Sequence, residues 1–276
     1  MGTSWRDNLL LTDREAIVSK MPLRFDLPWV PISAIAQQFY CEVKVDHEYK
    51  FGKVPTPEKE EGTVLHEEII EMEPVTVEEL VKSIEKKPIC FCTFPVFGKI
   101  DGLTMFGIPD AILFRKSIPS HLIELKTTNG DVSRLWRDQV VQVKAYAMAL
   151  DLMGFQCGGL GLSLVRVNKN GISAEAKDTM LNAVAEGLLD GQVESVEASL
   201  NRRFHSQLKV HRLAYNKEDA LKDVMWARDY WVMKRDPIPT RNAAKCKACE
   251  FNEKCPFSLV TAAGKNLKLP GGHPAA

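Results

Sequence analysis

Residues 107–128 read GIPDAILFRKSIPSHLIELKTT, two short runs of β-branched and apolar residues with a turn between them. Such a pattern predicts two antiparallel strands joined as a hairpin. Side chains two positions apart share a face of a strand, so Glu124 and Lys126 should point the same way. Asp110 lies fourteen positions before Glu124, and two strands of roughly seven residues would bring these two carboxylates side by side.

Two neighbouring carboxylates repel each other unless a cation lies between them. Hard oxygen ligands of this kind suit Mg²⁺ or Mn²⁺. A metal ion held there can lower the pKa of a bound water and stabilise charge on a phosphate, and Lys126 would orient that water or neutralise the transition state. Asp101, in the sequence GKIDG, is a competing carboxylate. We favour Asp110 because its spacing to Glu124 fits a single hairpin.

Polar residues on predicted helices before and after this hairpin are two further candidate parts of the site. His66 lies in a stretch with helical spacing upstream of the strands, and Gln142 and Tyr146 are four positions apart on the helix that follows them. Residues four apart share one face of a helix. A single histidine is more often a satisfied surface or core residue than a ligand, so the value of these residues lies in their order around Asp110 and Glu124.

The rest of the chain predicts a sheet flanked by helices, which is an α/β fold. Residues 88–128 have the texture of a meander of antiparallel strands, and two more strands are expected at 158–168 and 208–215. Apolar spacing and capping residues predict helices at 34–40, 63–72, 77–86, 131–153, 177–200 and 217–234, the first of them ending near Cys41.

The charges of the chain balance, with 36 Lys and Arg against 36 Asp and Glu. This balance excludes a polyanion-coating protein of the histone type but leaves room for a local basic groove. One cluster of basic residues could form a wall of such a groove, or could simply be a solvated face: Arg202, Arg203, His205, Lys209, His211 and Arg212. A hydrophobic content of 45% fills a core and excludes disorder as the main state.

The sequence contains no membrane or export signal that we can identify. No apolar run approaches the ~20 residues that span a bilayer. The N-terminal stretch MGTSWRDNLLLTDREAIV mixes charges into its apolar residues, unlike a secretory signal. We therefore expect no membrane association and a cytoplasmic location.

The seven cysteines are odd in number, and a disulfide framework is not expected in a reducing cytosol. Cys246-x2-Cys249-x5-Cys255-Pro has the close spacing of a metal or cluster site. Zinc is one candidate, but close cysteines that end in Cys-Pro are more typical of an iron–sulfur site. These three cysteines leave one coordination position of the site to be filled by another residue. The remaining cysteines are Cys90 and Cys92, expected as buried free thiols in an apolar strand, the uncommitted Cys157, and Cys41 at the end of the first helix.

The nuclease-like features resemble those of a known family. His66, Pro109-Asp110, Glu124-x-Lys126 and Gln142-x3-Tyr146, in this order, resemble the RecB-like branch of the PD-(D/E)XK nucleases over roughly residues 33–257. The resemblance implies a restriction-endonuclease-like core with a central mixed sheet flanked by helices. It also implies that His66, Asp110, Glu124 and the carbonyl of Leu125 bind the metal, that Lys126 assists the water, and that Gln142 and Tyr146 belong to a helix that supports the site and touches DNA.

The cysteines extend this resemblance. One cysteine far upstream of the nuclease motifs and three just after them is the arrangement of the iron–sulfur RecB-like nucleases, which include the CRISPR-associated exonuclease of the fourth Cas family and the nuclease domains of AddB and eukaryotic Dna2. The resemblance implies that Cys41, Cys246, Cys249 and Cys255 hold a four-iron four-sulfur cluster joining the N- and C-terminal parts, with zinc as the alternative. The implied organisation is a lead-in at 1–30, a nuclease domain at 31–260 that includes Cys41 and 246–256, and a flexible tail at 261–276.

The resulting expectation is a DNA nuclease dependent on Mg or Mn that acts on single strands or overhangs. The chain has no helicase motor and no phosphate-binding loop, so the resemblance is to the stand-alone CRISPR type, which would trim DNA fragments before their capture and work with the integrase proteins. Arg202, Arg203 and Lys209 are candidate DNA-binding residues. Two alternatives stay open: a general repair nuclease outside CRISPR, and a DNA-end-binding subunit that keeps the cluster without cutting.

Overall fold

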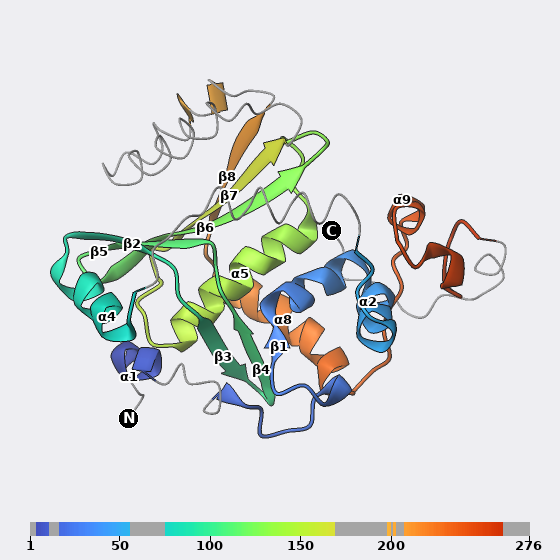
Figure 1. Cartoon of the computed structure of the whole chain (residues 1–276), viewed down its shortest axis with the longest axis horizontal. Coiled ribbons are helices and arrows are strands. Elements are labelled where there is room, and N and C mark those ends of the chain that lie inside the picture. Colours follow the sequence, from blue (N-terminus) through green and yellow to red (C-terminus); the bar gives the residue numbers. More distant parts are fainter. Residues whose placement is uncertain are drawn as a thin grey trace.

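The computed structural model describes residues 4–10, 17–55, 75–168, 198–199, 201–202 and 207–261. Its strands form two sheets, one of five strands in the order β2-β5-β6-β7-β8 and one of three in the order β1-β4-β3 (Figure 1). The larger sheet consists of β2 (Ile89–Cys92), β5 (Ala111–Arg115), β6 (Ile118–Thr128), β7 (Gly161–Asn168) and β8 (Leu208–Ala214). The smaller one consists of β1 (Val30–Pro31), β3 (Val96–Ile100) and β4 (Leu103–Gly107).

The larger sheet is mixed. β6 and β7 run parallel, and the helix α5 (Arg137–Leu152) connects them, whereas the other neighbouring strands are antiparallel. β6 lies in the middle of the sheet, and Leu122, Ile123, Glu124 and Leu125 are all buried. The structure therefore confirms an α/β fold in which mixed sheets are flanked by helices.

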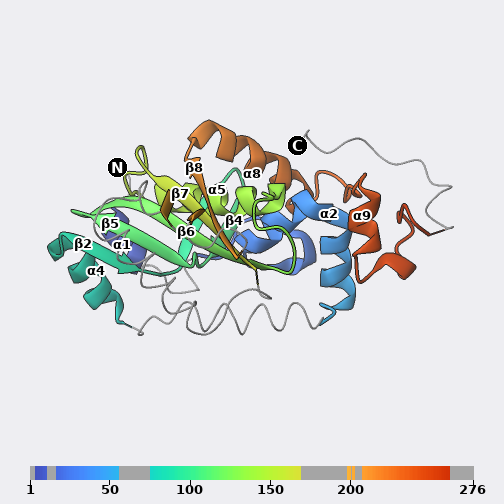
Figure 2. The ribbon, with the colours of Figure 1, turned by 90° about the horizontal axis from the view of Figure 1, so that it is seen from above.

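The helices pack around α5, whose side chains from Ala145 to Leu150 are all buried. Figure 1 shows α5 along the sheet, and Figure 2 shows α4 and α9 at opposite ends of the molecule. The other helices are α1 (Trp5–Leu10), α2 (Ile32–Phe51), α4 (Val77–Lys86), α8 (Lys217–Trp231) and α9 (Ala243–Lys247), with short 3-10 turns η2 (Arg24–Asp26) and η4 (Asn252–Lys254). Among the described residues, we find no helix with the length and apolar character needed to cross a bilayer.

The strand and helix predictions hold in part. The helix at 77–86 is confirmed, and Thr76 and Glu79 form a reciprocal capping box at its start. The strands at 88–128 are present, but they are not one meander, because the β3–β4 hairpin pairs with β1 in the smaller sheet. The helices predicted at 63–72 and, up to residue 197, at 177–200 lie outside the described residues.

Three helix boundaries differ from the prediction. α2 does not end near Cys41 but resumes after a break at this residue (φ −171°, ψ 117°) and reaches Phe51. The N–H of Glu42 donates instead to the carbonyl of Ile238, so a distant segment replaces the lost helical bond. α5 begins at Arg137 and not at Asp131, since the Asp131 carboxylate accepts a hydrogen bond from the N–H of Ser133 and closes a local turn. α8 ends at Trp231 and not at Lys234.

The described part of residues 1–30 packs against the rest of the fold. Leu9 of α1 is 1% exposed and belongs to the main hydrophobic core. Asn8 donates to the carbonyl of Met153, and the Arg24 guanidinium donates to the carbonyls of Tyr230 and Arg235. These contacts fix the N-terminal segment to α8 and to the end of α5.

Candidate active site and cysteine pocket

The pairing of β5 with β6 positions Asp110. Ala111 pairs with Ile123, so Asp110, directly before β5, reaches the segment Glu124–Lys126. Its Oδ2 atom accepts a hydrogen bond from the N–H of Leu125 at 2.6 Å. The hairpin predicted for residues 107–128 is therefore present, and it places Asp110 beside the Glu-x-Lys segment.

Glu124 is the buried centre of the polar network, with only 2% of its surface exposed. Its Oε1 atom accepts hydrogen bonds from Lys126 Nζ at 2.8 Å and from Gln142 Nε2 at 2.7 Å. Glu124 and Lys126 share a face of β6 because they are two positions apart. The Lys126 side chain is 26% exposed, so the network is open to solvent at the lysine.

The charges around Lys126 keep it protonated. Burial lowers the pKa of this lysine, but Glu124, by charge and hydrogen bond, and then Asp110 and Asp138 outweigh burial and raise its pKa above the ordinary value. Lys126 is therefore a cation at neutral pH, which suits a group that stabilises an anion. Burial, with a further contribution from Glu124, raises the pKa of Tyr146, so its hydroxyl stays neutral.

α5 supplies Gln142 and Tyr146 on the face that meets the sheet. Gln142 Nε2 also lies 3.4 Å from the Tyr146 hydroxyl, to which it donates. The ring of Tyr146 fits against the end of β4 because residue 107 is a glycine; a Cβ atom there would lie 2.7 Å from Tyr146 Cε1. The structure thus brings both residues of the predicted Gln-x3-Tyr pair to Glu124.

The competing carboxylate, Asp101, lies elsewhere. It occupies the turn between β3 and β4 in the smaller sheet. Its side chain is 62% exposed and forms an ion pair with Arg228 of α8 at 2.8 Å. Asp101 therefore pairs with Arg228, and it lies on the β3–β4 hairpin, whereas Glu124 lies on β6 of the larger sheet.

The carboxylate pair has the chemistry of a divalent-cation site. Asp110 and Glu124 supply hard oxygen ligands, and the carbonyl of Leu125 directly follows Glu124 in sequence. The third predicted side-chain ligand, His66, lies outside the described residues. Within the described ranges, no three His, Cys, Asp or Glu side chains are grouped closely enough to hold a metal ion. Asp110 and Glu124 are therefore candidate ligands, and the described residues do not complete a metal site around them.

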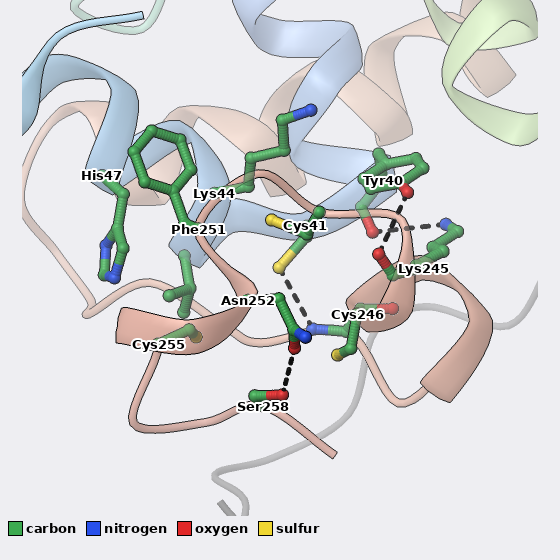
Figure 3. A pocket seen from close by; sticks show the side chains of 13 residues that line it. Tyr40, Cys41, Lys44, His47, Lys245, Cys246, Phe251, Asn252, Cys255 and Ser258 are labelled. Carbon is green, nitrogen blue, oxygen red and sulfur yellow. Dashed lines mark hydrogen bonds between the residues drawn. The ribbon is translucent and has the colours of Figure 1, made fainter. Parts of the chain in front are cut away.

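The four cysteines of the predicted cluster line one pocket (Figure 3). Cys41 comes from the break in α2, whereas Cys246, Cys249 and Cys255 come from α9 and the segment after it. The Cys41 thiol accepts a hydrogen bond from the N–H of Thr240 at 3.4 Å. The pattern of one early and three late cysteines thus corresponds to one place in the fold.

Contacts around this pocket join α2 to the part of the chain that follows α8. Lys245 donates from Nζ to the carbonyls of Phe39 and Tyr40, and Lys44 forms an ion pair with Glu250 at 3.0 Å. The buried Glu42 carboxylate binds the guanidinium of Arg235. These interactions span about two hundred residues of sequence.

Burial favours the neutral form of three thiols in the pocket. Burial is the main factor that raises the pKa of Cys41, Cys249 and Cys255. Thiolates in such surroundings require a cation for their stabilisation. Within the described ranges, however, no three of these thiols are grouped closely enough to hold a metal ion, so the pocket gathers the four cysteines without forming a metal site.

The other cysteines are buried free thiols, as predicted for Cys90 and Cys92. These two lie on the same face of β2, and Cys92 lies 3.9 Å from the carbonyl of Ile112. Cys157 is 2% exposed, and none of the three lines the pocket around Cys41.

The predicted basic cluster does not form one face. Lys209 pairs with Arg166 of β7, whereas Arg212 pairs with Ser163 and so belongs to the opposite face of the sheet. Arg202 is exposed, and Arg203 lies outside the described residues.

The sequence analysis missed Arg166. This residue lies on β7 directly opposite Lys126 of β6 and is 2% exposed. Its one signal in the sequence is a basic residue inside the apolar run GLSLVRVN. Only the strand pairing shows that it belongs beside the Glu-x-Lys segment.

One family model matches most of the chain. The family model of the PD-(D/E)XK nuclease superfamily matches residues 46–256. The crystal structure of SSO0001 is similar over 93% of this chain and 96% of that chain, with 14% sequence identity and a TM-score of 0.46. No curated protein matches the chain significantly in sequence.

Proposed function

Because the chain belongs to the PD-(D/E)XK nuclease superfamily, we propose that it is a metal-dependent DNA nuclease with its active site at Asp110, Glu124 and Lys126. The observation that carries this proposal is the hydrogen-bonded group on β6 and α5: Glu124 between Lys126 and Gln142, with Asp110 on the N–H of Leu125. A purely structural carboxylate would not need a second carboxylate and a partly exposed lysine next to it.

Each residue of the site has a distinct role in this proposal. Asp110, Glu124 and the carbonyl of Leu125, with His66, would hold Mg²⁺ or Mn²⁺, which when bound supplies Lewis acidity and lowers the pKa of water. Lys126, a cation at neutral pH, orients the attacking water and offsets negative charge that develops on the phosphate. Gln142 keeps the Glu124 carboxylate in place, and Tyr146 supports Gln142.

The test is hydrolysis of labelled DNA by the wild type and by single alanine variants, with Mg²⁺, Mn²⁺ or no added metal. Asp110→Ala, Glu124→Ala and Lys126→Ala should each lower the rate by about a hundred-fold or more, because each removes part of the transition-state stabilisation. DNA binding measured without added metal should largely survive. Asp101→Ala is the control and should cut normally. A Glu124→Ala protein that cleaves DNA at the wild-type rate would contradict the proposed active site.

The cysteine pocket supports a second part of the proposal, a four-iron four-sulfur cluster held by Cys41, Cys246, Cys249 and Cys255. Four thiols line a single pocket. Closely spaced cysteines that end in Cys-Pro are typical of iron–sulfur proteins. The cluster would act as a clasp between α2 and the segment 246–256, and not as the catalyst. Zinc on the same thiols is the alternative that metal analysis distinguishes.

The finer assignment is to the stand-alone, CRISPR-associated type within the RecB-like branch. We propose a nuclease domain at 31–260 that trims single strands or overhangs in the cytoplasm before integrase proteins capture the fragments. Support comes from the order of the cysteines around the nuclease motifs. Cas integrase genes beside this gene would support the assignment. A neighbourhood of repair genes alone would favour a general repair nuclease.

The basic residues proposed to bind DNA can be tested separately. Arg202 is exposed and Lys209 is partly buried on β8, and Arg203 is proposed with them. Neutralising Arg202 and Arg203 together should flatten the dependence of log K on log salt, because fewer counterions are released. An unchanged slope would show that these arginines do not meet the phosphates.

A further inference from the structure

Arg166 is a buried arginine that forms no ion pair with any residue in the described ranges. It is 2% exposed, and its Nε and Nη1 atoms are buried without a hydrogen bond in the described part of the chain. Burial lowers the pKa of Arg166, and the carboxylates that oppose this effect, Asp131 and Asp138, form no ion pair with it among the described residues. Folded proteins rarely leave a buried charge in this state, so Arg166 calls for a ligand.

The position of Arg166 indicates which ligand. Lys126, Arg166 and Lys209 are direct partners across β6, β7 and β8. Direct partners share a face of a sheet, at about 4.8 Å from one strand to the next. The three cations therefore form a row on the face that carries Glu124, and the row begins at the active-site lysine.

The surroundings of Arg166 keep this row positive. Arg134 of the 129–136 loop lies near enough to act on the charge of Arg166, as do Asp131 and Asp138. Glu124 binds and offsets the charge of Lys126, so Arg166, Lys209 and Arg134 remain against the two carboxylates Asp131 and Asp138, an excess of one positive charge. An excess of positive charge around the buried guanidinium favours an anion as its ligand.

We infer that Arg166 binds a phosphate of the DNA strand, next to the phosphate at Glu124 and Lys126. The inference rests on the proposed nuclease function and adds the place where the strand is held. A planar guanidinium donates two parallel hydrogen bonds either from Nη1 and Nη2 or from Nε and Nη2, so one phosphate would satisfy Nε or Nη1, the two donors that are buried without a partner in the described part of the chain. The phosphate would reach Arg166 from the side of Lys126, whose side chain is 26% exposed.

The experiment uses the full-length protein and a single-stranded oligonucleotide that carries one neutral methylphosphonate, moved along the strand position by position. Binding is measured without added divalent metal, so that the DNA is not cut. The variants are Arg166→Met, Arg166→Lys and, as the matched control, Arg212→Met, which changes an exposed arginine on the opposite face of β8. Thermal unfolding of each variant shows whether it is folded.

For the wild type, one methylphosphonate position should weaken binding about ten- to hundred-fold, the size expected for losing a charge-assisted hydrogen bond. Arg166→Met should bind unmodified DNA more weakly by a similar factor and lose its sensitivity at that position alone. Arg166→Lys should keep part of this sensitivity, and Arg212→Met should keep all of it.

Two results would overturn the inference and leave the nuclease proposal intact. One is a folded Arg166→Met protein with the wild-type methylphosphonate profile, and the other is loss of sensitivity at every position equally, which would mean a general structural role. If the wild type binds but does not cut DNA with Mg²⁺ or Mn²⁺, the proposed function fails, and the methylphosphonate profile still decides whether Arg166 contacts a phosphate.

Discussion

At the scale of single residues, the position of Glu124 depends on donors from two elements. A buried carboxylate needs hydrogen bonds that replace its lost hydration. Lys126 supplies one from the same strand, and Gln142 supplies the other from α5. The Gln142 bond is the one that ties the helix to the proposed metal ligand.

Gln142→Leu should therefore reduce catalysis more than it reduces binding. Loss of a hydrogen bond to a charged group is worth roughly 1.5–3 kcal/mol, which corresponds to a rate about ten- to hundred-fold lower. Steady-state cleavage should show the change in kcat, with little change in KM for DNA. Lys144→Leu, on the same helix, is the control. Equal losses in both variants would mean that the helix as a whole, and not this hydrogen bond, supports the site.

A second residue-scale prediction concerns His121, on the face of β6 away from Glu124. Burial lowers the pKa of His121, and the cations Arg212 and Arg115 lower it further. The unfolded chain takes up a proton near the ordinary value of 6.5, whereas the folded chain resists it. Stability from the neutral histidine is therefore present above this pH and is lost as the pH falls below it towards the folded pKa.

Urea unfolding at pH 7.5 and pH 5 checks the sign. The wild type should be less stable at pH 5, and His121→Gln should show a smaller difference between the two pH values. Part of the difference should remain, because burial also lowers the pKa of His211. If His121→Gln leaves the difference unchanged, the histidine takes up its proton equally in both states.

The residue scale also shows what the sequence could and could not predict. Asp110, Glu124 and Lys126 could be found because a hairpin of known spacing relates them locally. Arg166 could not, because its relation to Lys126 depends on the parallel pairing of β6 with β7 across a helical crossover. No short-range pattern encodes which residue of a distant strand lies opposite the lysine.

At the scale of elements, the close approach of β3 to α5 depends on one glycine. A Cβ atom at Gly98 would lie 2.6 Å from Leu152 Cδ1 and 2.9 Å from Met105 Cε. Both atoms are ends of flexible side chains, so they could move, but only by disturbing a packed layer.

Gly98→Ala should therefore destabilise the protein by about 1–3 kcal/mol, the usual range for overpacking. Gly158→Ala is the matched control, because a Cβ atom there would meet nothing within 4 Å, and it should change stability by no more than about 0.5 kcal/mol. Denaturant unfolding of the two variants compares them directly. A Gly98→Ala protein as stable as the control would mean that the layer has room to relax.

The sequence predicts helices and strands that have strong local signals. It does not predict which strands pair with one another or which distant segments they contact. The capping box at Thr76 marks the start of α4 in the sequence itself. The split of strands 88–128 into two sheets depends on β1, a two-residue strand more than fifty positions upstream. The break of α2 at Cys41 was visible as a helix end, but its continuation depends on the carbonyl of Ile238, from the far end of the chain.

At the scale of the whole molecule, α2, near the start of the chain, meets α9 and the segment after it at the cysteine pocket. Three contacts join the two regions: the N–H of Thr240 donates to the Cys41 thiol, Lys245 donates to the carbonyl of Phe39, and Lys44 forms an ion pair with Glu250. A ligand so distant in sequence can be recruited only after the sheet and α5 have formed. The proposed cluster would therefore stabilise a domain that is already folded.

The last prediction follows from this closure. Replacing any one of Cys41, Cys246, Cys249 or Cys255 with Ala should remove the iron and lower Tm by about 5–15 °C, since the binding energy of the cluster is also folding energy. Protein purified without oxygen is assayed for iron, sulfide and zinc, and its unfolding is followed on heating. Cys157→Ala is the control: its thiol is buried and lies outside the pocket, so its removal should leave the iron content unchanged. One zinc per chain without sulfide would remove the iron–sulfur proposal and leave the nuclease site untouched. Loss of metal from Cys157→Ala but not from Cys41→Ala would mean that the clasp joins other parts of the chain.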